Sequence, residues 1–375
     1  MKQQDLTEEY FMPGDWIEIA NIILKSRGAV LVLGATDTGK SICTLLFANF
    51  WAKHGRKVGI VDVDMGQSDL GPPTTMGMIL IDKPTKSLKE LSTNSLYFIG
   101  STSPLNYFLP TICGTKKLID EGKKKGAEII IVNTTGLVKG NLGRTLKENM
   151  IDIISPSHII ALQRRDELEH ILKNINLTDR IVIHRLSPCT EVKRKTYFQR
   201  REVREEKFRK YFKKASSLKI NLANLNIKGS YYCSDVALEE EDLSFLEKTL
   251  ITEIIYAEKM SEGIFIIIKE ELFKRLSGFF RAKKRFNVEK LIITEEDKFK
   301  NLLVSLDDRQ GFVVSLGIIQ KCDFKGKIFT IFAPLKEKDL SKVFSLKFGA
   351  IQLGVDGKEL GKVYLLLNRK PSRLG

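Results

Sequence analysis

Short, nearly continuous apolar runs alternate with stretches of helical periodicity over the first half of the chain. The runs are rich in Val, Ile and Leu, which is typical of strands buried on both faces of a parallel sheet. The stretches between them repeat apolar residues every three to four positions, as amphipathic helices do. This alternation predicts an α/β fold in which helices flank a mostly parallel sheet. The predicted strands are 29–33, 58–64, 128–133, 158–162 and 180–185, with 96–100 as a further candidate, and the predicted helices are 41–53, 111–125, 142–154 and 165–174.

The pattern changes near residue 220. Short apolar runs are now separated by turn residues with little helix between them, which predicts a smaller β-rich C-terminal domain. We therefore divide the chain into an N-terminal extension (1–28), an α/β domain (29–219) and the β-rich domain (220–375), with no room for a separate N-terminal domain. The predicted C-terminal strands are 263–268, 311–316, 327–332, 350–353 and 362–367.

Composition limits the class of protein. A chain of 375 residues is long enough for two domains, and 43% hydrophobic and 29% charged residues are ordinary for a globular protein. We find no run long and apolar enough to cross a membrane and no signal peptide. The five cysteines show no paired spacing, which argues against a structural zinc site and favours reduced thiols in the cytoplasm. The formal net charge of +15 favours a polyanionic partner such as nucleic acid.

The segment Gly34–Ser41 has the pattern of a phosphate-binding loop, between a predicted strand and a predicted helix. Glycines let the backbone turn its N–H groups toward phosphate oxygens, and the helix N-terminus adds positive potential. Lys40 is placed to reach the β- and γ-phosphates, and the Ser41 hydroxyl to bind Mg²⁺. The sequence thus predicts a P-loop NTPase fold that binds a nucleoside triphosphate through this loop. The loop residues are Gly34, Ala35, Thr36, Asp37, Thr38, Gly39, Lys40 and Ser41. The next residue, Ile42, has no hydroxyl group.

Two carboxylates end the second predicted strand. Alternation along a strand would put Asp62 and Asp64 on the same face, near the triphosphate. A carboxylate there can hold Mg²⁺ through water or accept the proton of an attacking hydroxyl as general base. The alternative is that the two residues only cap a helix or form a turn.

Two further segments carry candidate chemistry. Asn133–Gly140 follows a buried strand and has hydroxyls and glycines that could contact a ligand, although by itself it is an ordinary strand-to-helix loop. The basic segment 193–214 would place Arg200 and Arg204 on one helical face, where two guanidinium groups can neutralise a transferring phosphoryl group. The alternative is a solvated charged helix.

Taken in order, these motifs resemble those of the polynucleotide 5′-hydroxyl kinases, a family linked to tRNA splicing, pre-mRNA cleavage and ribosomal RNA processing. The similarity runs from about residue 29 to 212 and is weaker around 311–361. Five segments of the chain resemble family motifs: the phosphate loop, the Walker B region with its continuation, a segment near the nucleic-acid end, the clasp and the Arg-x-x-x-Arg lid. The corresponding residues here are 34–41, Asp64–Gln67 with Pro73–Gly77, Phe98–Pro104, Asn133–Gly136 and Arg200–Arg204.

The resemblance implies a role for each matched position. Lys40 would bind the ATP phosphates, Asp64 would act as general base on the 5′-hydroxyl, and Gln67 would lie close to phosphate or metal. Arg200 and Arg204 would close over the transferring group. Substrate contacts are expected from Thr102, Thr134 and Gly136, and Mg²⁺ contacts from Ser41, Asp62 and Asp64.

One departure concerns the clasp. The family has an aromatic residue after the clasp glycine, able to stack on a base, and this chain has Leu137. Stacking contributes roughly 1–3 kcal/mol per base where it occurs.

We therefore expect transfer of the γ-phosphate of ATP to the 5′-hydroxyl end of RNA or DNA, with Mg²⁺ as cofactor. One alternative is a MinD-like switch ATPase, but such proteins carry a second lysine early in the loop, where this chain has Ala35 and Thr36. Another is an ATP-binding module without catalysis, against which the complete set of catalytic side chains argues. The basic stretch 274–286, interleaved with Phe, fits equally well an extended nucleic-acid surface or an amphipathic connector.

Overall fold

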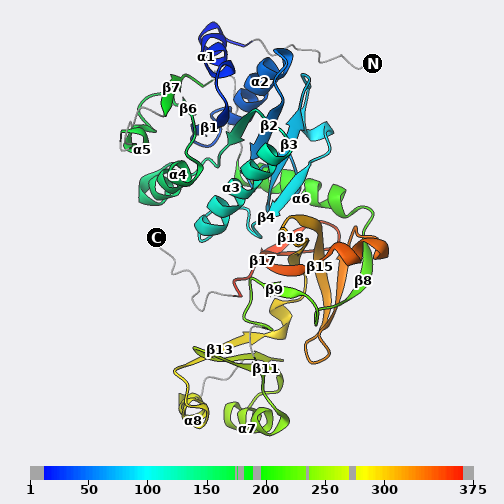
Figure 1. Cartoon of the computed structure of the whole chain (residues 1–375). Coiled ribbons are helices and arrows are strands. Elements are labelled where there is room, and N and C mark those ends of the chain that lie inside the picture. The colour runs from blue at the N-terminus through cyan, green and yellow to red at the C-terminus, as the bar shows by residue number, and fades with distance from the viewer. Residues whose placement is uncertain are drawn as a thin grey trace. The chain divides into compact units, whose positions relative to one another are not determined.

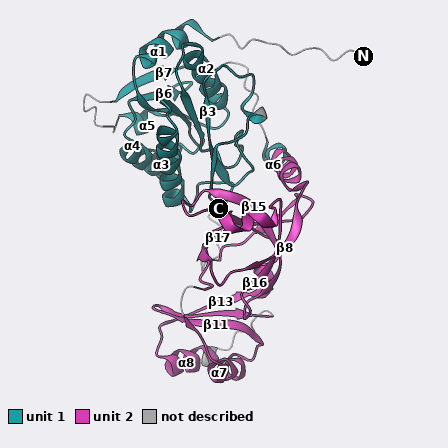
Figure 2. Ribbon diagram, turned by 45° about the vertical axis from the view of Figure 1, so that its right-hand side comes forward, with its two compact units in different colours: residues 1–200 teal, residues 201–375 magenta. Residues whose placement is uncertain are grey.

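The structure is a computed structural model that describes residues 12–173, 175, 181–188, 196–233, 236–269 and 276–365. The start of the basic segment, 193–195, and the pair Lys274 and Arg275 lie outside the described residues. The chain divides into two compact units, residues 1–200 and 201–375 (Figure 2). Helix α6 (Tyr197–Phe212) crosses this division. Among the described residues no helix is long and apolar enough to cross a membrane.

The first unit is built on a sheet in the order β4-β3-β2-β5-β1-β6-β7 (Figure 1). Its pairs are parallel except those of β3, which runs antiparallel to β2 and β4. The predicted mostly parallel sheet flanked by helices is confirmed. The strands are β1 (Gly28–Gly34), β2 (Val58–Asp62), β3 (Thr75–Ile81), β4 (Ser95–Phe98), β5 (Ile129–Asn133), β6 (His158–Leu162) and β7 (Val182–Leu186), and the helices are α1 (Gly14–Leu24), α2 (Lys40–Lys53), α3 (Phe108–Lys124), α4 (Gly140–Ile154) and α5 (Glu169–Leu172), with a 3₁₀ turn η1 (Leu88–Glu90).

Helix α1, part of the predicted N-terminal extension, belongs to the core of this unit. Trp16, Ala20 and Ile23 recur at helical spacing and are buried against α2 and one face of the sheet. The Trp51 indole donates a hydrogen bond to the Ala20 carbonyl, 3.0 Å away. The sequence analysis also missed strand β3, because the Pro and Thr residues before it resemble a turn. Helix α5 covers only four of the ten residues predicted for it.

A contact between two buried histidines, His158 and His184, connects β6 and β7. His158 Nδ1 lies 3.1 Å from His184 Nε2, and its other ring nitrogen lies 2.8 Å from Ser26 Oγ. Burial, reinforced by the nearby His184, lowers the pKa of His158 to about 4 from its usual value of 6.5. The folded state therefore keeps this ring neutral at pH values where the unfolded chain takes up a proton.

This pKa predicts a pH dependence of stability. As the pH falls from about 6.5 to about 4, the unfolded state gains the proton first, so His158 should lower the free energy of unfolding by about 1–3 kcal/mol over that window. In His158→Gln the free energy of unfolding, measured by urea titration, should fall less across the same pH range. The matched control is His54→Gln, at an exposed position after α2. Equal pH slopes for wild type and His158→Gln would contradict the prediction.

The second unit contains two sheets, so the β-rich prediction is correct but incomplete. The larger sheet has the order β18-β17-β14-β15-β16-β8, with β9 pairing to β17, and the smaller has the order β10-β11-β12-β13. Two helices, α7 and α8, pack on the smaller sheet, where little helix was expected. Helix α8 is strongly amphipathic and buries Ala282 and Phe286, in keeping with the amphipathic alternative for the stretch 274–286. The elements are β8 (Ser216–Asn221), β9 (Asn226–Lys228), β10 (Val236–Ala237), α7 (Glu240–Leu250), β11 (Ile254–Met260), β12 (Gly263–Ile268), α8 (Leu276–Phe286), β13 (Lys290–Glu295), η2 (Glu296–Lys298), β14 (Leu302–Asp307), β15 (Val313–Asp323), β16 (Ile328–Ala333), η3 (Glu337–Lys342), β17 (Ser345–Leu353) and β18 (Glu359–Lys362).

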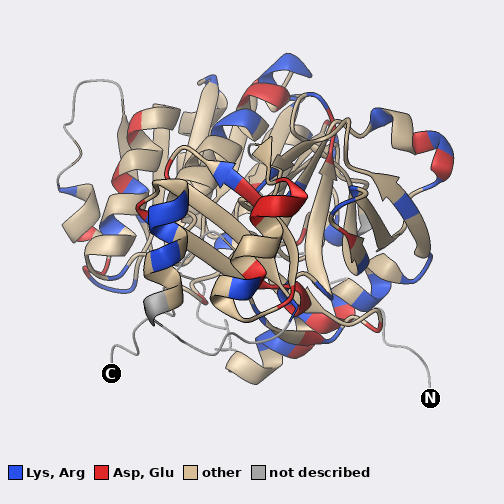
Figure 3. Cartoon of the chain, turned by 90° about the horizontal axis from the view of Figure 1, so that it is seen from below, with Lys and Arg blue, Asp and Glu red and all other residues tan. Residues whose placement is uncertain are grey.

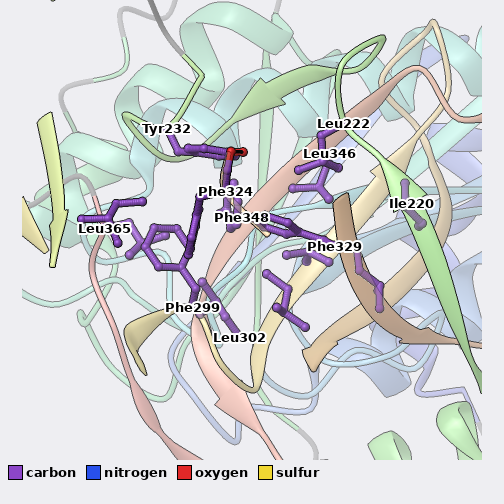
Figure 4. Packing of buried hydrophobic residues seen from close by; sticks show 14 of the residues in the cluster. Ile220, Leu222, Tyr232, Phe299, Leu302, Phe324, Phe329, Leu346, Phe348 and Leu365 are labelled. Atoms are coloured by element: carbon purple, nitrogen blue, oxygen red, sulfur yellow. Dashed lines mark hydrogen bonds between the residues drawn. The ribbon is translucent and has the colours of Figure 1, made fainter. Parts of the chain in front are cut away.

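An aromatic cluster fills the core of the larger sheet (Figure 4). Phe324 and Phe299 pack edge to face at 5.0 Å between ring centroids, and the Tyr232 hydroxyl donates to the Phe324 carbonyl. The predicted strand 362–367 is wrong over 363–365, because pairing with β17 uses residues 359–362 instead. Strand β8 pairs with β16 and lies across the predicted domain boundary at 219/220; that boundary stays a prediction.

Candidate active site

The phosphate loop joins the end of β1 to the start of α2, as its sequence predicts. Gly39 precedes the helix with φ +82°, a left-handed conformation that glycine adopts without strain. Thr38 Oγ1 and Lys40 Nζ both donate to the Ala35 carbonyl, at 2.9 and 2.7 Å. The Lys40 side chain thus folds back over the loop, with its ammonium group at the loop's centre.

The Lys40 ammonium lies among carboxylates. Only 7% of the residue is exposed, and this burial lowers its pKa from the usual lysine value. The negative charges of Asp64, Asp37 and Asp62 act in the opposite direction and favour the charged form. An ammonium group held in this way at a phosphate loop is suited to bind phosphate oxygens.

Asp62 and Asp64 differ in their surroundings. Strand β2 ends at Asp62, and Asp64 lies in the turn that follows, so the predicted shared strand face is wrong. The Asp62 carboxylate accepts hydrogen bonds from the backbone N–H groups of Asp64 (3.1 Å) and Asp69 (2.8 Å). These bonds stop the extended strand and form the turn. Burial raises the pKa of Asp62 to about 7, with Asp69 and Asp64 adding to the effect.

Asp64 is oriented by the same turn. Its Oδ1 accepts from the backbone N–H groups of Gly66 (3.2 Å) and Gln67 (3.1 Å), while the residue remains half-buried. The Gln67 side-chain amide donates to the Gly66 carbonyl at 2.8 Å and to the Arg200 carbonyl at 3.2 Å. Asp64 therefore has a fixed orientation and an accessible carboxylate, the arrangement that a general base needs.

Asn133 is a site residue that the sequence reasoning did not assign. It ends β5, which lies between β2 and β1, and its amide donates to Asp62 Oδ1 (3.0 Å) and Ser41 Oγ (3.2 Å). Among the described residues its Oδ1 is one of the few buried side-chain atoms without a hydrogen-bond partner. A polar residue at the end of a strand adjacent to the phosphate-loop strand is the signal that could have identified it.

This group of oxygens fits a magnesium ion. Mg²⁺ prefers carboxylate and other oxygen ligands, and it usually keeps several waters and takes substrate phosphates as well. Ser41 Oγ and the Asp62 and Asp64 carboxylates supply oxygens around the end of the loop, and the Asn133 amide bonds to Ser41 and Asp62. Within the described part of the chain no set of three or more His, Cys, Asp or Glu residues forms a complete metal cage.

The three predicted substrate contacts lie on segments that meet the loop or the Asp64 turn. Gly136 lies so close to Thr36 that a Cβ at this position would be 2.4 Å from Thr36 Oγ1. Thr134 is fully buried and donates its hydroxyl to the Val32 carbonyl of β1 at 2.8 Å. The Thr102 carbonyl lies against Gly66, where a Cβ would be 2.7 Å from it. The roles of Thr102, Thr134 and Gly136 in substrate binding stay predictions.

Two guanidinium groups converge on Asp37 in the loop. Arg200 Nη2 lies 2.6 Å from the Asp37 carboxylate, as an ion pair, and Arg164 Nη2 donates to the Asp37 carbonyl at 3.1 Å. The sequence analysis predicted Arg200 and missed Arg164, although basic residues directly after β6 lie at the same edge of the sheet as the loop. Arg200 and Arg164 thus place two positive charges beside the phosphate loop.

Arg204, one helical turn after Arg200, has a different environment within the second unit. Its Nε and Nη2 donate to the two carboxylate oxygens of Glu359, at 2.5 and 3.0 Å. The residue is only 7% exposed, and the neighbouring Phe208 is buried in the same helix. The structure thus gives Arg204 a buried bidentate ion pair; its predicted role in the lid is not tested.

Comparison with known proteins places this site in a family. Residues 34–214 match the family model described as the P-loop of the mRNA cleavage and polyadenylation factor CLP1. The chain is 33% identical over 352 residues to a polyribonucleotide 5′-hydroxyl-kinase of Methanocaldococcus jannaschii, covering 93% of this chain and 94% of the relative. The chain belongs to the polyribonucleotide 5′-hydroxyl-kinase family. A second member, from Pyrococcus abyssi, is 32% identical, with 90% of this chain and 91% of the relative covered.

The fold of the family is also found among solved structures. The Clp1p chain of a Clp1p–Pcf11p complex aligns with 89% of this chain and 78% of its own length, with a TM-score of 0.55 at 10% identity. At this identity the likeness concerns the fold. It supports the P-loop architecture of the first unit and extends over most of the second.

Proposed function

We propose that this family member transfers the γ-phosphate of ATP to the 5′-hydroxyl end of RNA. One observation carries the proposal: the oriented Asp64 carboxylate lies within electrostatic reach of the Lys40 ammonium, at the end of a complete phosphate loop. A base beside a bound triphosphate is what transfer to a hydroxyl requires, whereas nucleotide binding alone does not need it. The names of the relatives support RNA as substrate.

The residues divide the work of in-line transfer. The backbone amides of the loop and Lys40 bind the phosphates, and Asp64 accepts the proton of the attacking 5′-hydroxyl. Ser41, with Asp62 and Asn133 behind it, would hold Mg²⁺, which neutralises phosphate charge when bound. Gln67, bonded to the turn, would lie near the phosphate or the metal.

Electrostatics support a nucleic-acid partner. The net charge of +15 attracts a polyanion, and the Lys and Arg segments occur on many helices and strands with acidic segments among them (Figure 3). Such a distribution gives general attraction to a phosphate backbone that weakens as salt rises. Transfer to DNA ends, and a cytoplasmic location suited to the reduced cysteines, remain parts of this proposal.

The test is transfer of labelled γ-phosphate from ATP to short 5′-hydroxyl RNA and DNA oligonucleotides with Mg²⁺. Label on the RNA 5′ end, removed by a 5′-phosphatase, is the expected result. ATP hydrolysis without label on either strand would instead indicate a switch ATPase. Tight ATP binding with neither transfer nor hydrolysis would indicate a non-catalytic module.

We expect substitutions of the two predicted lid arginines to have different effects, on catalysis for Arg200 and on stability for Arg204. Arg200→Ala should lower kcat on the order of 100-fold or more, because it removes a cation at the phosphate loop, with little change in the free energy of unfolding. Arg204→Ala should lower the free energy of unfolding by about 3 kcal/mol, since it leaves the Glu359 carboxylate without its partner. The measurements are kcat and urea unfolding, with the exposed Arg209→Ala on the same helix as control. Wild-type kcat in Arg200→Ala would remove that residue from the mechanism.

A further inference from the structure

A lysine that the mechanism above does not use is completely buried behind the site. Lys147 lies on α4 with no exposed surface, and its Nζ donates to the Thr135 carbonyl at 2.7 Å and to Thr135 Oγ1 at 3.2 Å. Burying an amine is unfavourable compared with burying an apolar side chain of similar size. What Lys147 provides, and an apolar residue would not, is a pair of hydrogen-bond donors to Thr135.

The surroundings of Lys147 favour the neutral amine. Burial lowers its pKa well below the usual lysine value, and the charge of Lys40 adds to this effect while Asp64 opposes it. Both acceptors of the Lys147 Nζ lie in the single residue Thr135. These interactions also show that Lys147 lies within electrostatic reach of the two residues that carry the proposed chemistry.

Thr135 connects Lys147 to the phosphate loop. The next residue, Gly136, contacts Thr36 so closely that a Cβ would be 2.8 Å from the Thr36 backbone nitrogen. The preceding residue, Thr134, is bonded to the β1 carbonyl of Val32. The segment 134–136 is thus fixed to β1 at one end, abuts the phosphate loop at the other, and is held from behind by Lys147.

We propose that Lys147 is a positioning residue that holds the segment 134–136 against the phosphate loop and so sets the rate of phosphate transfer. The inference rests on the proposed function. Without the hydrogen bonds from Lys147, the Thr135 peptide can change its orientation. Gly136 then loses its close contact with Thr36. ATP itself is bound mainly by the amides of the loop and by Lys40, so nucleotide affinity depends much less on Lys147.

The experiment compares Lys147→Met, which keeps the length and removes the donors, with Lys147→Gln, which restores N–H donors. Lys147→Met should lower kcat/KM for a 5′-hydroxyl RNA by about tenfold or more while the Kd for ATP with Mg²⁺ changes by less than about threefold. The kcat/KM of Lys147→Gln should be at least about threefold higher than that of Lys147→Met. Arg144→Met, an exposed position on the same helix, is the matched control and should behave as wild type.

Thermal unfolding of each variant separates positioning from folding. If Lys147→Met does not fold, Thr135→Val is the second variant: it removes the Oγ1 acceptor at nearly constant shape and should lower kcat/KM by about threefold. Unchanged kcat/KM in the folded variants, or equal losses in ATP affinity and transfer, would overturn the inference. Absence of transfer by the wild type would instead overturn the proposed function.

Discussion

Lys40→Ala should abolish phosphate transfer, with kcat lowered on the order of 1000-fold or more. The substitution removes the ammonium group that lies over the loop on the Ala35 carbonyl, and with it the positive charge facing the phosphates. It also removes the positive charge that Lys40 places near Asp64, Asp37 and Asp62, so the triphosphate meets a more negative site. We therefore expect weaker ATP binding as well as lost transfer, measured by labelled γ-phosphate transfer and by equilibrium dialysis.

The matched control is Lys53→Ala on the same helix, an exposed lysine at the far end of α2. It makes the same change of charge away from the loop and should leave kcat unchanged. Circular dichroism and thermal unfolding check that Lys40→Ala is folded. Near-normal transfer by a folded Lys40→Ala protein would mean that the phosphate loop is not where the reaction occurs.

Asp64→Asn should keep ATP bound and lose the chemical step. The asparagine has the same shape, and its Oδ1 can still accept from the backbone N–H groups of Gly66 and Gln67, so the turn is preserved. It can no longer accept the proton of the 5′-hydroxyl, which should lower kcat by about 100- to 10,000-fold. Single-turnover transfer measures the chemical step, and the Kd for ATP should change by less than about threefold.

The control for this substitution is Asp82→Asn, at an exposed position just after β3, which removes the same charge away from the site. Asp62→Asn is the informative comparison, because Asp62 shapes the turn by accepting from two backbone N–H groups. A mild effect of Asp64→Asn on the chemical step would contradict its role as the base and would leave Asp62 as the next candidate.

Local patterns in the sequence determined the catalytic fold of the first unit and its phosphate loop. A strand buried on both faces needs an uninterrupted apolar run, and a loop around phosphate needs glycines before a helix; both requirements involve only neighbouring residues. The strands β1, β5 and β6 were therefore predicted to within about a residue at each end. The loop could be named for the same reason, whereas the roles predicted for Asp64 and Arg200 came from the order of motifs that resembles the kinase family.

Some elements were missed. Helix α1 lies in the segment assigned to an N-terminal extension, and strand β3 follows Pro72 and Pro73 although its residues 76–81 form an apolar run. Asp64 was placed on the strand face because alternation alone cannot say where a strand ends. The end of β2 is decided by the Asp62 carboxylate, which binds the backbone of the next turn.

Only the tertiary structure decided which distant side chains meet. The order β2-β5-β1 brings Asn133 to Ser41 and Asp62, and the return of the chain after β17 brings Glu359 to Arg204, 155 residues away. Periodicity records whether a residue is buried but not which partner it meets, because the partner depends on strand order. The sequence by itself thus determined a phosphate-binding kinase scaffold, while the fold determined which oxygens gather beside the phosphate loop and placed the buried amine behind them.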